Sequence, residues 1–327
     1  MAVDAAQPSR TPRILIVRRD NIGDLVCTTP LLEALRARLP RAWIGALVTT
    51  YNSEVLAGNP ALDEVFVYEK LKHRTGGLIA HVRSRLGQMS TLRRKKLDCV
   101  LVPAPALQSL RIARSLRPGQ VIAAPLTFPA SMHEVERIFA LGRSLGVTGT
   151  PGPLRIFPDA EEVLALKRRI GAGPFTAVHI SARRPAQRWP LHRYASLAAQ
   201  LSKQGPVLLL WAPGSKDNPG HPGDDEAAAE ISRNAAGQAS APVIPLATPD
   251  LKTLIAALSL AGRVICPDGG AMHLAAALGK PVVALFGDSP VERWRPWGVA
   301  HRVLRPESRD LADLPLEPVL EACRALA

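Results

Sequence analysis

The sequence predicts an α/β protein composed of two doubly wound domains, each built on a parallel sheet. Short apolar runs of the buried-strand type alternate along the chain with segments of helical period. A cluster rich in Gly, Pro and Thr at residues 146–153 interrupts this alternation, which then restarts. The chain has 327 residues, of which 47% are hydrophobic and 21% charged, so it is long enough for two ordinary domains of a soluble globular protein.

The first domain is expected to cover residues 1–153. Its first βαβ unit consists of a strand at 13–18, a helix at 25–39 and a strand at 42–48. Further strands are expected at 64–68, 97–103 and 121–124, and further helices at 107–116 and 133–145.

The second domain is expected to cover residues 154–327 and repeats the alternation. Strands are expected at 175–181, 207–213, 243–246, in the apolar run that stops at Pro267, and in the run that follows 279–281. Helices are expected at 191–201, 224–232, 250–261 with Asp250 at its cap, and from near Ala271. A closing helix at 316–327 could pack back on the first domain.

Composition also bounds the cellular setting. No apolar stretch reaches the roughly 18 residues that a membrane span requires. The polar N-terminus "MAVDAAQPSRTPR" has no apolar core of a secretory signal. The four cysteines, at positions 27, 99, 266 and 323, form no CxxC pair and are expected to be reduced and mostly buried, as in a cytoplasmic protein.

The net charge of +13 is concentrated in the first half of the chain. Residues 1–150 carry 21 Lys and Arg against 11 Asp and Glu, whereas residues 151–327 carry 20 against 17. Residues 70–96 hold nine Lys and Arg, two His and no acid. This segment indicates a polyanionic partner, with a merely solvated face as the alternative. It has no aromatic residue for base stacking, so nucleic acid is the weaker choice of partner.

The loop "PDGGAMH", residues 267–273, is the first candidate binding site. Gly269 and Gly270 allow the backbone to turn and approach a ligand, and the following helix presents unpaired N–H groups that suit a phosphate or diphosphate. Asp268 would orient the loop or meet a hydroxyl, and His273 could donate to an anionic oxygen. The alternative is a tight turn without a ligand. The GxGxxG and GxxxxGK[ST] patterns are absent here, which argues against a dinucleotide-binding dehydrogenase and a P-loop NTPase.

Two further loops carry chemistry-bearing residues. "RRDNIGD" places Gly23 and Asp24 at the start of a helix, where Asp24 is either a functional carboxylate or a cap, and Asp20 competes for the same role. "SARRPAQRWPLHRY" combines Ser181 with arginines after a strand, a pattern that suits bidentate phosphate binding.

These motifs together resemble glycosyltransferase family 9, the heptosyltransferase group that builds the inner core of bacterial lipopolysaccharide. The resemblance runs almost end to end. It rests on "ILIVRRDNIGDLVCTTPLLEALRARLP", "NPALDEVFVY", "HEVERIFALGRSLGV", "QRWPLHRYASLAAQL" and "PDGGAMHLAAALGKPVVALFGDSPVERWRPWG". It implies a GT-B fold, in which an N-terminal acceptor domain and a C-terminal donor domain face each other across a cleft.

The resemblance also implies roles for particular residues. Asp24 matches the general base of an inverting transfer from an ADP-sugar, with no metal or other cofactor required. Implied donor-binding residues are Ser181, Arg188, Asp268, Gly269, Gly270, Ala271, Met272 and His273, with Arg183, Arg184, Gln187 and Asp217 as weaker candidates. Implied acceptor-binding residues are Gly23, Lys70, Lys72, Arg74, Arg93, Arg94, Lys95 and Lys96. They would meet an anionic glycolipid at the cytoplasmic face of the inner membrane.

The chain departs from the family pattern at three places. Gly269 replaces the usual Thr or Ser, and Gln187 stands where many members have Lys, so an arginine at 183, 184 or 188 must supply the positive charge. The acidic residue for the ribose is missing at its usual place, which leaves Asp217 as the candidate. Two other functions stay open: a nucleotide-sugar epimerase of the same fold, and a non-catalytic binder of anionic glycolipid.

Overall fold

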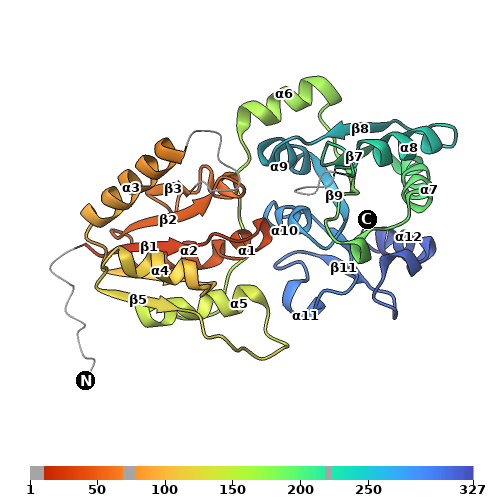
Figure 1. Cartoon of the computed structure of the whole chain (residues 1–327). Helices are drawn as coiled ribbons and strands as arrows, with labels where there is room; N and C mark the ends of the chain where they lie inside the picture. The colour runs from red at the N-terminus through yellow and green to blue at the C-terminus, as the bar shows by residue number, and fades with distance from the viewer. Residues whose placement is uncertain (1–10, 69–77, 218–222, 327) are drawn as a thin grey trace. The chain divides into compact units, whose positions relative to one another are not determined.

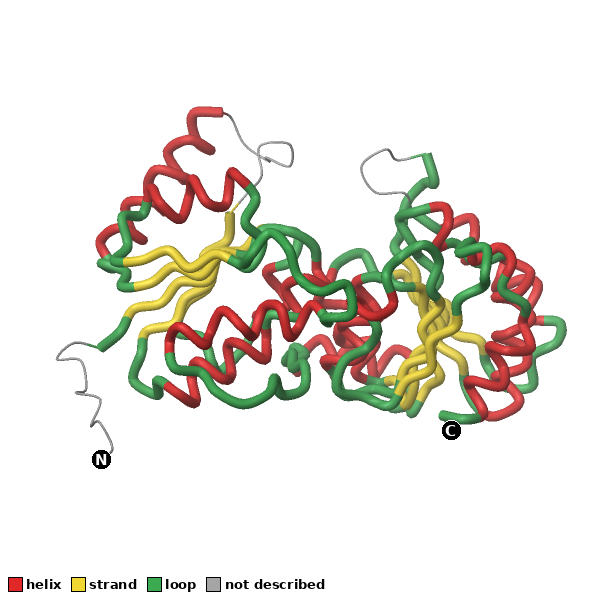
Figure 2. Tube along the Cα trace, turned by 90° about the horizontal axis from the view of Figure 1, so that it is seen from below, coloured by secondary structure: helices red, strands yellow, loops and turns green. Residues whose placement is uncertain are grey.

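The computed structural model describes residues 11–68, 78–217 and 223–326 of the chain, without the side chains of residues 78–82 and 84. The chain divides into two compact units, Met1–Gly152 and Pro153–Ala327 (Figure 1). Each unit contains one parallel sheet with helices on both of its faces (Figure 2). The predicted fold class, two doubly wound α/β domains, is thereby confirmed.

The first unit has five described strands in the order β3-β2-β1-β4-β5. Its elements are β1 (Arg13–Val17), α1 (Ile22–Val26), α2 (Thr29–Arg38), β2 (Trp43–Thr49), η1 (Ser53–Leu56), β3 (Glu64–Tyr68), α3 (Leu78–Arg94), β4 (Cys99–Val102), α4 (Leu107–Ser115), β5 (Gln120–Ala123), α5 (Glu134–Phe139) and η3 (Ala140–Leu145). The central strand β1 is buried, because alternate side chains face helices on opposite sides of the sheet. Leu15 and Val17 pack with Leu92 of α3 and Ile112 of α4, while α2 lies against α5 and η3.

The prediction of one continuous helix at 25–39 is wrong. The structure has α1 up to Val26 and a new helix α2 from Thr29. Pro30 explains the break, because it has no N–H to bond the carbonyl of Val26 four residues earlier. The Thr29 hydroxyl donates to that carbonyl instead, at 2.8 Å.

The second unit has six described strands in the order β11-β10-β9-β6-β7-β8. Its elements are α6 (Ala160–Ile170), β6 (Phe175–His179), η4 (Pro185–Gln187), α7 (Leu191–Leu201), η5 (Ser202–Gln204), β7 (Val207–Trp211), α8 (Asp225–Ala236), β8 (Val243–Ala247), α9 (Leu251–Ser259), β9 (Ala261–Pro267), α10 (Gly270–Ala277), β10 (Val282–Leu285), α11 (Val291–Trp294), β11 (His301–Leu304), η6 (Leu311–Asp313) and α12 (Leu316–Arg324). Numbered within the unit, this is the strand order of the Rossmann fold.

The helices of the second unit form two groups. α7, α8 and α12 bury apolar side chains on one face of the sheet, and α6 packs on α9, which contacts α10. Val319, Ala322 and Cys323 of α12 belong to the core of the second unit.

Some predictions about single elements hold, and some elements were missed. Asp250 caps α9, since its Oδ1 accepts from the Thr253 N–H at 2.8 Å. Sequence reasoning did not predict α3, α6 or β11. The four cysteines, all within the described residues, are buried and form no disulfide. None of the described helices has the length and hydropathy to cross a membrane.

Candidate functional site

Each sheet has one switch point, where neighbouring parallel strands lead into connections on opposite faces. These points lie between β1 and β4 in the first unit and between β6 and β9 in the second. In open α/β sheets, ligands bind beyond the carboxyl ends of the strands at such points. The predicted loops follow β1, β6 and β9, so all three lie at these positions.

The first switch point is organised around Arg18, whose side chain is only 1% exposed. Its Nη2 lies 2.8 Å from Asp24 Oδ1 and 3.1 Å from Glu134 Oε1, and its Nε lies 3.0 Å from Asp20 Oδ1. One buried guanidinium therefore gathers three carboxylates from the β1–α1 loop, α1 and α5. A charge buried this deeply is tolerated only when it is paired and hydrogen-bonded.

Asp24 is held in place from both sides. Its Oδ1 meets Arg18, and its Oδ2 accepts from the Asn21 side-chain amide at 2.9 Å and from the Asn21 N–H at 3.3 Å. Asn21 and Asp24 thus form the capping box of α1, so the predicted capping role is real. The Asp24 side chain remains 12% exposed and lies in the first helical turn, where a negative charge is favoured.

The pKa values of this cluster follow from burial and mutual charge. Burial acts to lower the pKa of Arg18, but Asp20, Asp24 and Glu134 together outweigh it and raise that pKa. Burial raises the pKa of Asp20 to about 6, although Arg18 pulls it down, and Asp24 adds to the rise. The Asp20 carboxyl therefore changes its charge near pH 6.

The predicted acceptor-binding residues fall into three groups. Gly23 is buried in α1 beside Asp24. Lys70, Lys72 and Arg74 lie outside the described residues. The last group, Arg93, Arg94, Lys95 and Lys96, lies where α3 ends and β4 is about to begin.

That position is near the amino-terminal ends of the strands, whereas Asp24 lies beyond the carboxyl end of β1. Lys95 pairs with Glu64 at 2.7 Å and lies 4.8 Å from the Trp43 ring centroid, and both partners are the first residues of their strands. Arg93 donates to the Ser115 carbonyl at 2.8 Å. A five-residue strand spans about 16 Å, so the structure does not bring these residues to Asp24.

The second switch point is formed mainly by backbone. Asp268 follows β9, Gly269 is the N-cap of α10, and α10 starts at Gly270 without a side-chain cap. The first N–H groups of α10 therefore face the loop without a capping side chain. An added Cβ at Gly269 would meet nothing within 4 Å, so the space beside this backbone is open.

Side chains of three loops form one hydrogen-bond network beside this helix start. Gln187 Nε2 donates to Asp268 Oδ2 at 2.9 Å and to Ser289 Oγ at 3.2 Å. Arg184 donates to Ser289 Oγ and, at 3.0 Å, to Asp288 Oδ2. Burial raises the pKa of Asp268, although Ser289, Arg184 and Gln187 each lower it.

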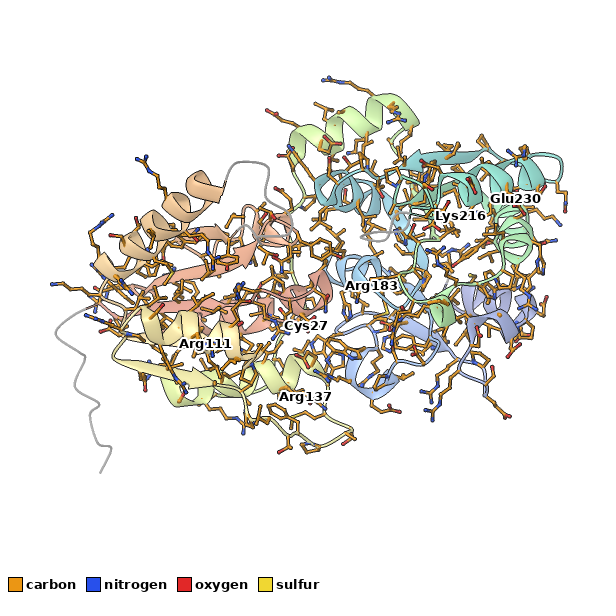
Figure 3. The ribbon with its side chains drawn as sticks, in the orientation of Figure 1. Cys27, Arg111, Arg137, Arg183, Lys216 and Glu230 are labelled. Carbon is orange, nitrogen blue, oxygen red and sulfur yellow. The ribbon has the colours of Figure 1, made fainter. Side chains whose placement is uncertain are left out.

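The other predicted donor residues are nearby or on adjacent loops. Ala271 and Met272 are buried in the first turn of α10, and His273 packs edge-on against the Trp294 ring at 5.9 Å. Ser181 Oγ accepts from the Ala212 N–H at 2.9 Å, joining the ends of β6 and β7. Arg183, labelled in Figure 3, is exposed on the loop after β6.

Arg188 is held by a buried acid. Its Nη1 donates to Asp224 Oδ1 at 2.7 Å. Three buried atoms around this pair have no hydrogen-bond partner among the described residues: Asp224 Oδ2, His179 Nδ1 and the Tyr194 hydroxyl. Burial lowers the pKa of His179 to about 4, against the opposing effect of Asp224.

Asp217, the candidate for the ribose, is exposed and its N–H donates to Ser215 Oγ at 3.2 Å. The structure brings Asp225 rather than Asp217 into the β7–α8 loop network. Asp225 accepts from Trp211 Nε1 at 2.7 Å and from the Gly214 N–H at 2.9 Å. Among the described residues, no three His, Cys, Asp or Glu side chains are arranged to hold a metal ion.

Sequence reasoning missed the partners that come from far along the chain. Arg18 and Glu134 are 116 residues apart, and Gln187 and Ser289 are 102 apart. A signal did exist for both: Arg18 directly follows a buried strand, and "GDSP" follows another. Charged or hydroxyl residues directly after buried strands are candidates for a switch-point site.

Comparison with known proteins gives concordant results. The family model described as glycosyltransferase family 9 (heptosyltransferase) matches residues 121–317. Lipopolysaccharide heptosyltransferase 2 of Salmonella typhimurium is 27% identical over 329 residues, covering 90% of this chain and 88% of that protein.

Two solved structures have a similar fold. The glycosyl transferase family 9 protein of Veillonella parvula has a TM-score of 0.81 and 21% identity, covering 96% of this chain and 97% of its own. The E. coli ADP-heptose lps heptosyltransferase II has a TM-score of 0.76 and 23% identity, covering 96% of this chain and 98% of its own.

Proposed function

The chain belongs to glycosyltransferase family 9 (heptosyltransferase). We propose that it transfers a heptose or related sugar from an ADP-sugar to a lipopolysaccharide inner core or similar glycolipid. The transfer inverts the anomeric centre, requires no metal, and uses Asp24 as general base. The relatives' names, which include lipopolysaccharide heptosyltransferase and ADP-heptose, support this choice of donor and acceptor.

The observation that carries the proposal is the uncapped start of α10 at the second switch point. Gly269 leaves open space beside the first N–H groups of the helix, and the helix dipole adds a partial positive charge there. A diphosphate fits this position better than a neutral group does. Backbone N–H groups held in place before the reaction stabilise the negative charge that develops on departing ADP.

Arginines supply the positive charge that Gln187 lacks. Gln187 is a neutral side chain buried against Asp268, so it holds the loop rather than neutralising phosphate. Arg184 is tied to the same network through Ser289, and Arg188 is fixed by Asp224. Either guanidinium can bind two phosphate oxygens at once, which a lysine cannot do.

Asp24 performs the proton transfer in the first unit. A carboxylate oxygen of Asp24 takes the proton of the acceptor hydroxyl while that oxygen forms a bond to the anomeric carbon. The bond between the anomeric carbon and the ADP oxygen breaks, and its electron pair leaves with ADP. Arg18 and Asn21 fix the orientation of the carboxylate, which is what a general base requires.

The basic first half of the chain suits an acidic acceptor. Its excess of positive charge would attract phosphorylated core sugars and the anionic inner face of the membrane, with an effect that salt screens. The contact with the inner membrane surface and the cytoplasmic location are part of this proposal.

The test is a transfer assay with ADP-heptose and heptose-deficient lipopolysaccharide core, followed by NMR of the product's anomeric configuration. We expect a product only when both substrates are present, with the configuration inverted relative to the donor. A converted donor without acceptor would instead identify an epimerase. Salt-sensitive binding of lipopolysaccharide without any thermal shift from ADP would identify a non-catalytic binder.

A further inference from the structure

The two consecutive arginines that follow β1 have opposite environments. Arg18 lies among three carboxylates, as described above. Arg19 packs instead on Tyr68, in line with the alternation of side chains along an extended chain. Tyr68 shares an apolar cluster with Leu15 and Leu92, on the face of the sheet that α3 covers.

Tyr68 contacts a second guanidinium as well. Its ring centroid lies 4.1 Å from Cζ of Arg19 and 4.5 Å from Cζ of Arg85. α3 runs alongside β3, because Gln88 donates to the Val67 carbonyl at 2.9 Å and Lys95 pairs with Glu64 at the other end of the strand. Arg85 is thereby placed at the carboxyl end of β3. Arg19 follows the carboxyl end of β1, so both arginines lie at the carboxyl ends of the parallel strands.

The positive charges of Arg19 and Arg85 are not balanced by a carboxylate among the described residues. Tyr68 is 5% exposed and Arg19 is 8% exposed, and Arg19 Nε is buried without a hydrogen-bond partner. No described carboxylate forms an ion pair with Arg19 or Arg85. A cation on an aromatic face gains about 0.5–2 kcal/mol, which does not replace a counter-ion for the buried Arg19 guanidinium beside the half-buried Arg85.

The pKa of Arg19 agrees with this picture. Burial lowers it, and the neighbouring charge of Arg85 lowers it further, with only Tyr68 acting in the opposite direction. An anion bound between the two groups would oppose both effects, because its negative charge favours the charged form of Arg19.

We propose that Arg19 and Arg85, stacked on Tyr68, form a binding site for an oxyanion, a phosphate or carboxylate group carried by the acceptor saccharide. Arg19 lies in the loop after β1, five positions before Asp24 in the first turn of α1, so this site would fix an acidic sugar near the general base. Two guanidinium groups suit an oxyanion because each presents a planar fork of donors. The claim that the acceptor saccharide carries this phosphate or carboxylate rests on the proposed function. The anion site itself does not rest on it.

The first experiment measures anion binding directly, by calorimetric titration of inorganic phosphate into the full-length protein at saturating ADP. ADP fills the donor site, so the phosphate that binds reports on another site. We expect Arg19→Gln and Arg85→Gln to weaken phosphate binding at least tenfold and Arg83→Gln to leave it unchanged, since Arg83 is exposed on the same helix. Thermal melts show whether each variant folds, and Arg19→Lys retains a cation if Arg19→Gln does not fold.

Equal phosphate binding in the wild type and Arg19→Gln would overturn the site, as would the absence of phosphate binding at saturating ADP. A further control is Glu69→Gln, since Glu69 follows Tyr68 in the sequence but lies outside the described residues. We expect Glu69→Gln to leave the affinity for phosphate unchanged. A gain of tenfold or more would show that this chain's own carboxylate fills the site, which contradicts the proposal.

The second experiment separates this site from the proposed function. In the transfer assay, Arg19→Gln and Arg85→Gln should raise the acceptor KM at least tenfold with kcat nearly unchanged, and the effect should shrink on an acceptor whose phosphates have been removed. Transfer with an unchanged acceptor KM would overturn the site as an acceptor site while the proposed function stands. Phosphate binding that depends on Arg19, in a protein that transfers no sugar, would support the site and refute the function.

Discussion

The two switch points occupy equivalent places in two sheets of the same type, yet they are built from different groups. In the first unit, the residues beyond β1 form a compact ionic cluster in which Arg18 pairs with Asp20, Asp24 and Glu134. In the second, the residues beyond β9 offer a helix start lined by glycine, and Gln187 provides a neutral bridge to Asp268.

This difference separates two kinds of chemistry. A carboxylate fixed by a buried arginine and an asparagine can accept a proton at a defined position. A run of backbone N–H groups beside open space can hold an anion and the charge that develops on it. Topology thus determines where a ligand can bind, whereas the side chains on the loops determine what chemistry each site can support.

The largest expected effect is on turnover, from Asp24→Asn. The amide keeps the shape of the side chain but cannot take a proton at neutral pH, so kcat should fall by about 10²–10⁴-fold. ADP affinity, measured by calorimetry, should stay within twofold of the wild type. Asp20→Asn is the matched comparison. If Asp20→Asn loses turnover and Asp24→Asn keeps it, the base is Asp20.

Next in size is the effect of Arg18→Met on stability. The change leaves three carboxylates around an apolar side chain, which should lower the free energy of unfolding by about 3–5 kcal/mol. Urea titration measures this, with Arg324→Met as the control, because Arg324 pairs with Glu317 on the surface. We expect the control to cost about 1 kcal/mol or less. Equal losses in the two variants would mean that the cluster has no special structural role.

A smaller effect concerns pH and His179 in the second unit. Its folded pKa of about 4 lies below the ordinary value of 6.5, so the unfolded chain binds more protons between these values. Stability from this group is full above pH 6.5 and is lost as the pH falls toward 4. His179→Gln should flatten that decline by up to about 3 kcal/mol, whereas His192→Gln, at an exposed position on α7, should not. An unchanged slope in His179→Gln would show that His179 is not buried as a neutral side chain.

The smallest expected effect is that of Gly269→Thr. The φ of Gly269 is 165°, an extended conformation that any residue adopts, and a Cβ there meets nothing within 4 Å. Stability should therefore change by no more than about 0.5 kcal/mol. The added hydroxyl could strengthen ADP binding by up to about tenfold, the contribution of one hydrogen bond. A weaker affinity would mean that the donor uses the space that the threonine fills.

Local sequence predicted the fold class and the loops, because strand, glycine turn and helix are features of adjacent residues. Gly270 became a candidate in this way, whereas the choice of Asp24 over Asp20 came from the family resemblance. The partners that give these residues their environment, such as Glu134 and Ser289, were missed, because only the folded chain brings them close. α3 was not predicted, so local sequence could not show that the basic residues 93–96 lie near the amino-terminal ends of the strands, away from Asp24.

The most direct test of the different roles assigned to the two switch points is hydrogen–deuterium exchange of the full chain with and without ADP. The account predicts slower exchange on ADP binding for the N–H groups at the start of α10, Gly270 to Met272, and unchanged exchange for residues 18–26. Slower exchange over residues 18–26 with none at the start of α10 would contradict it.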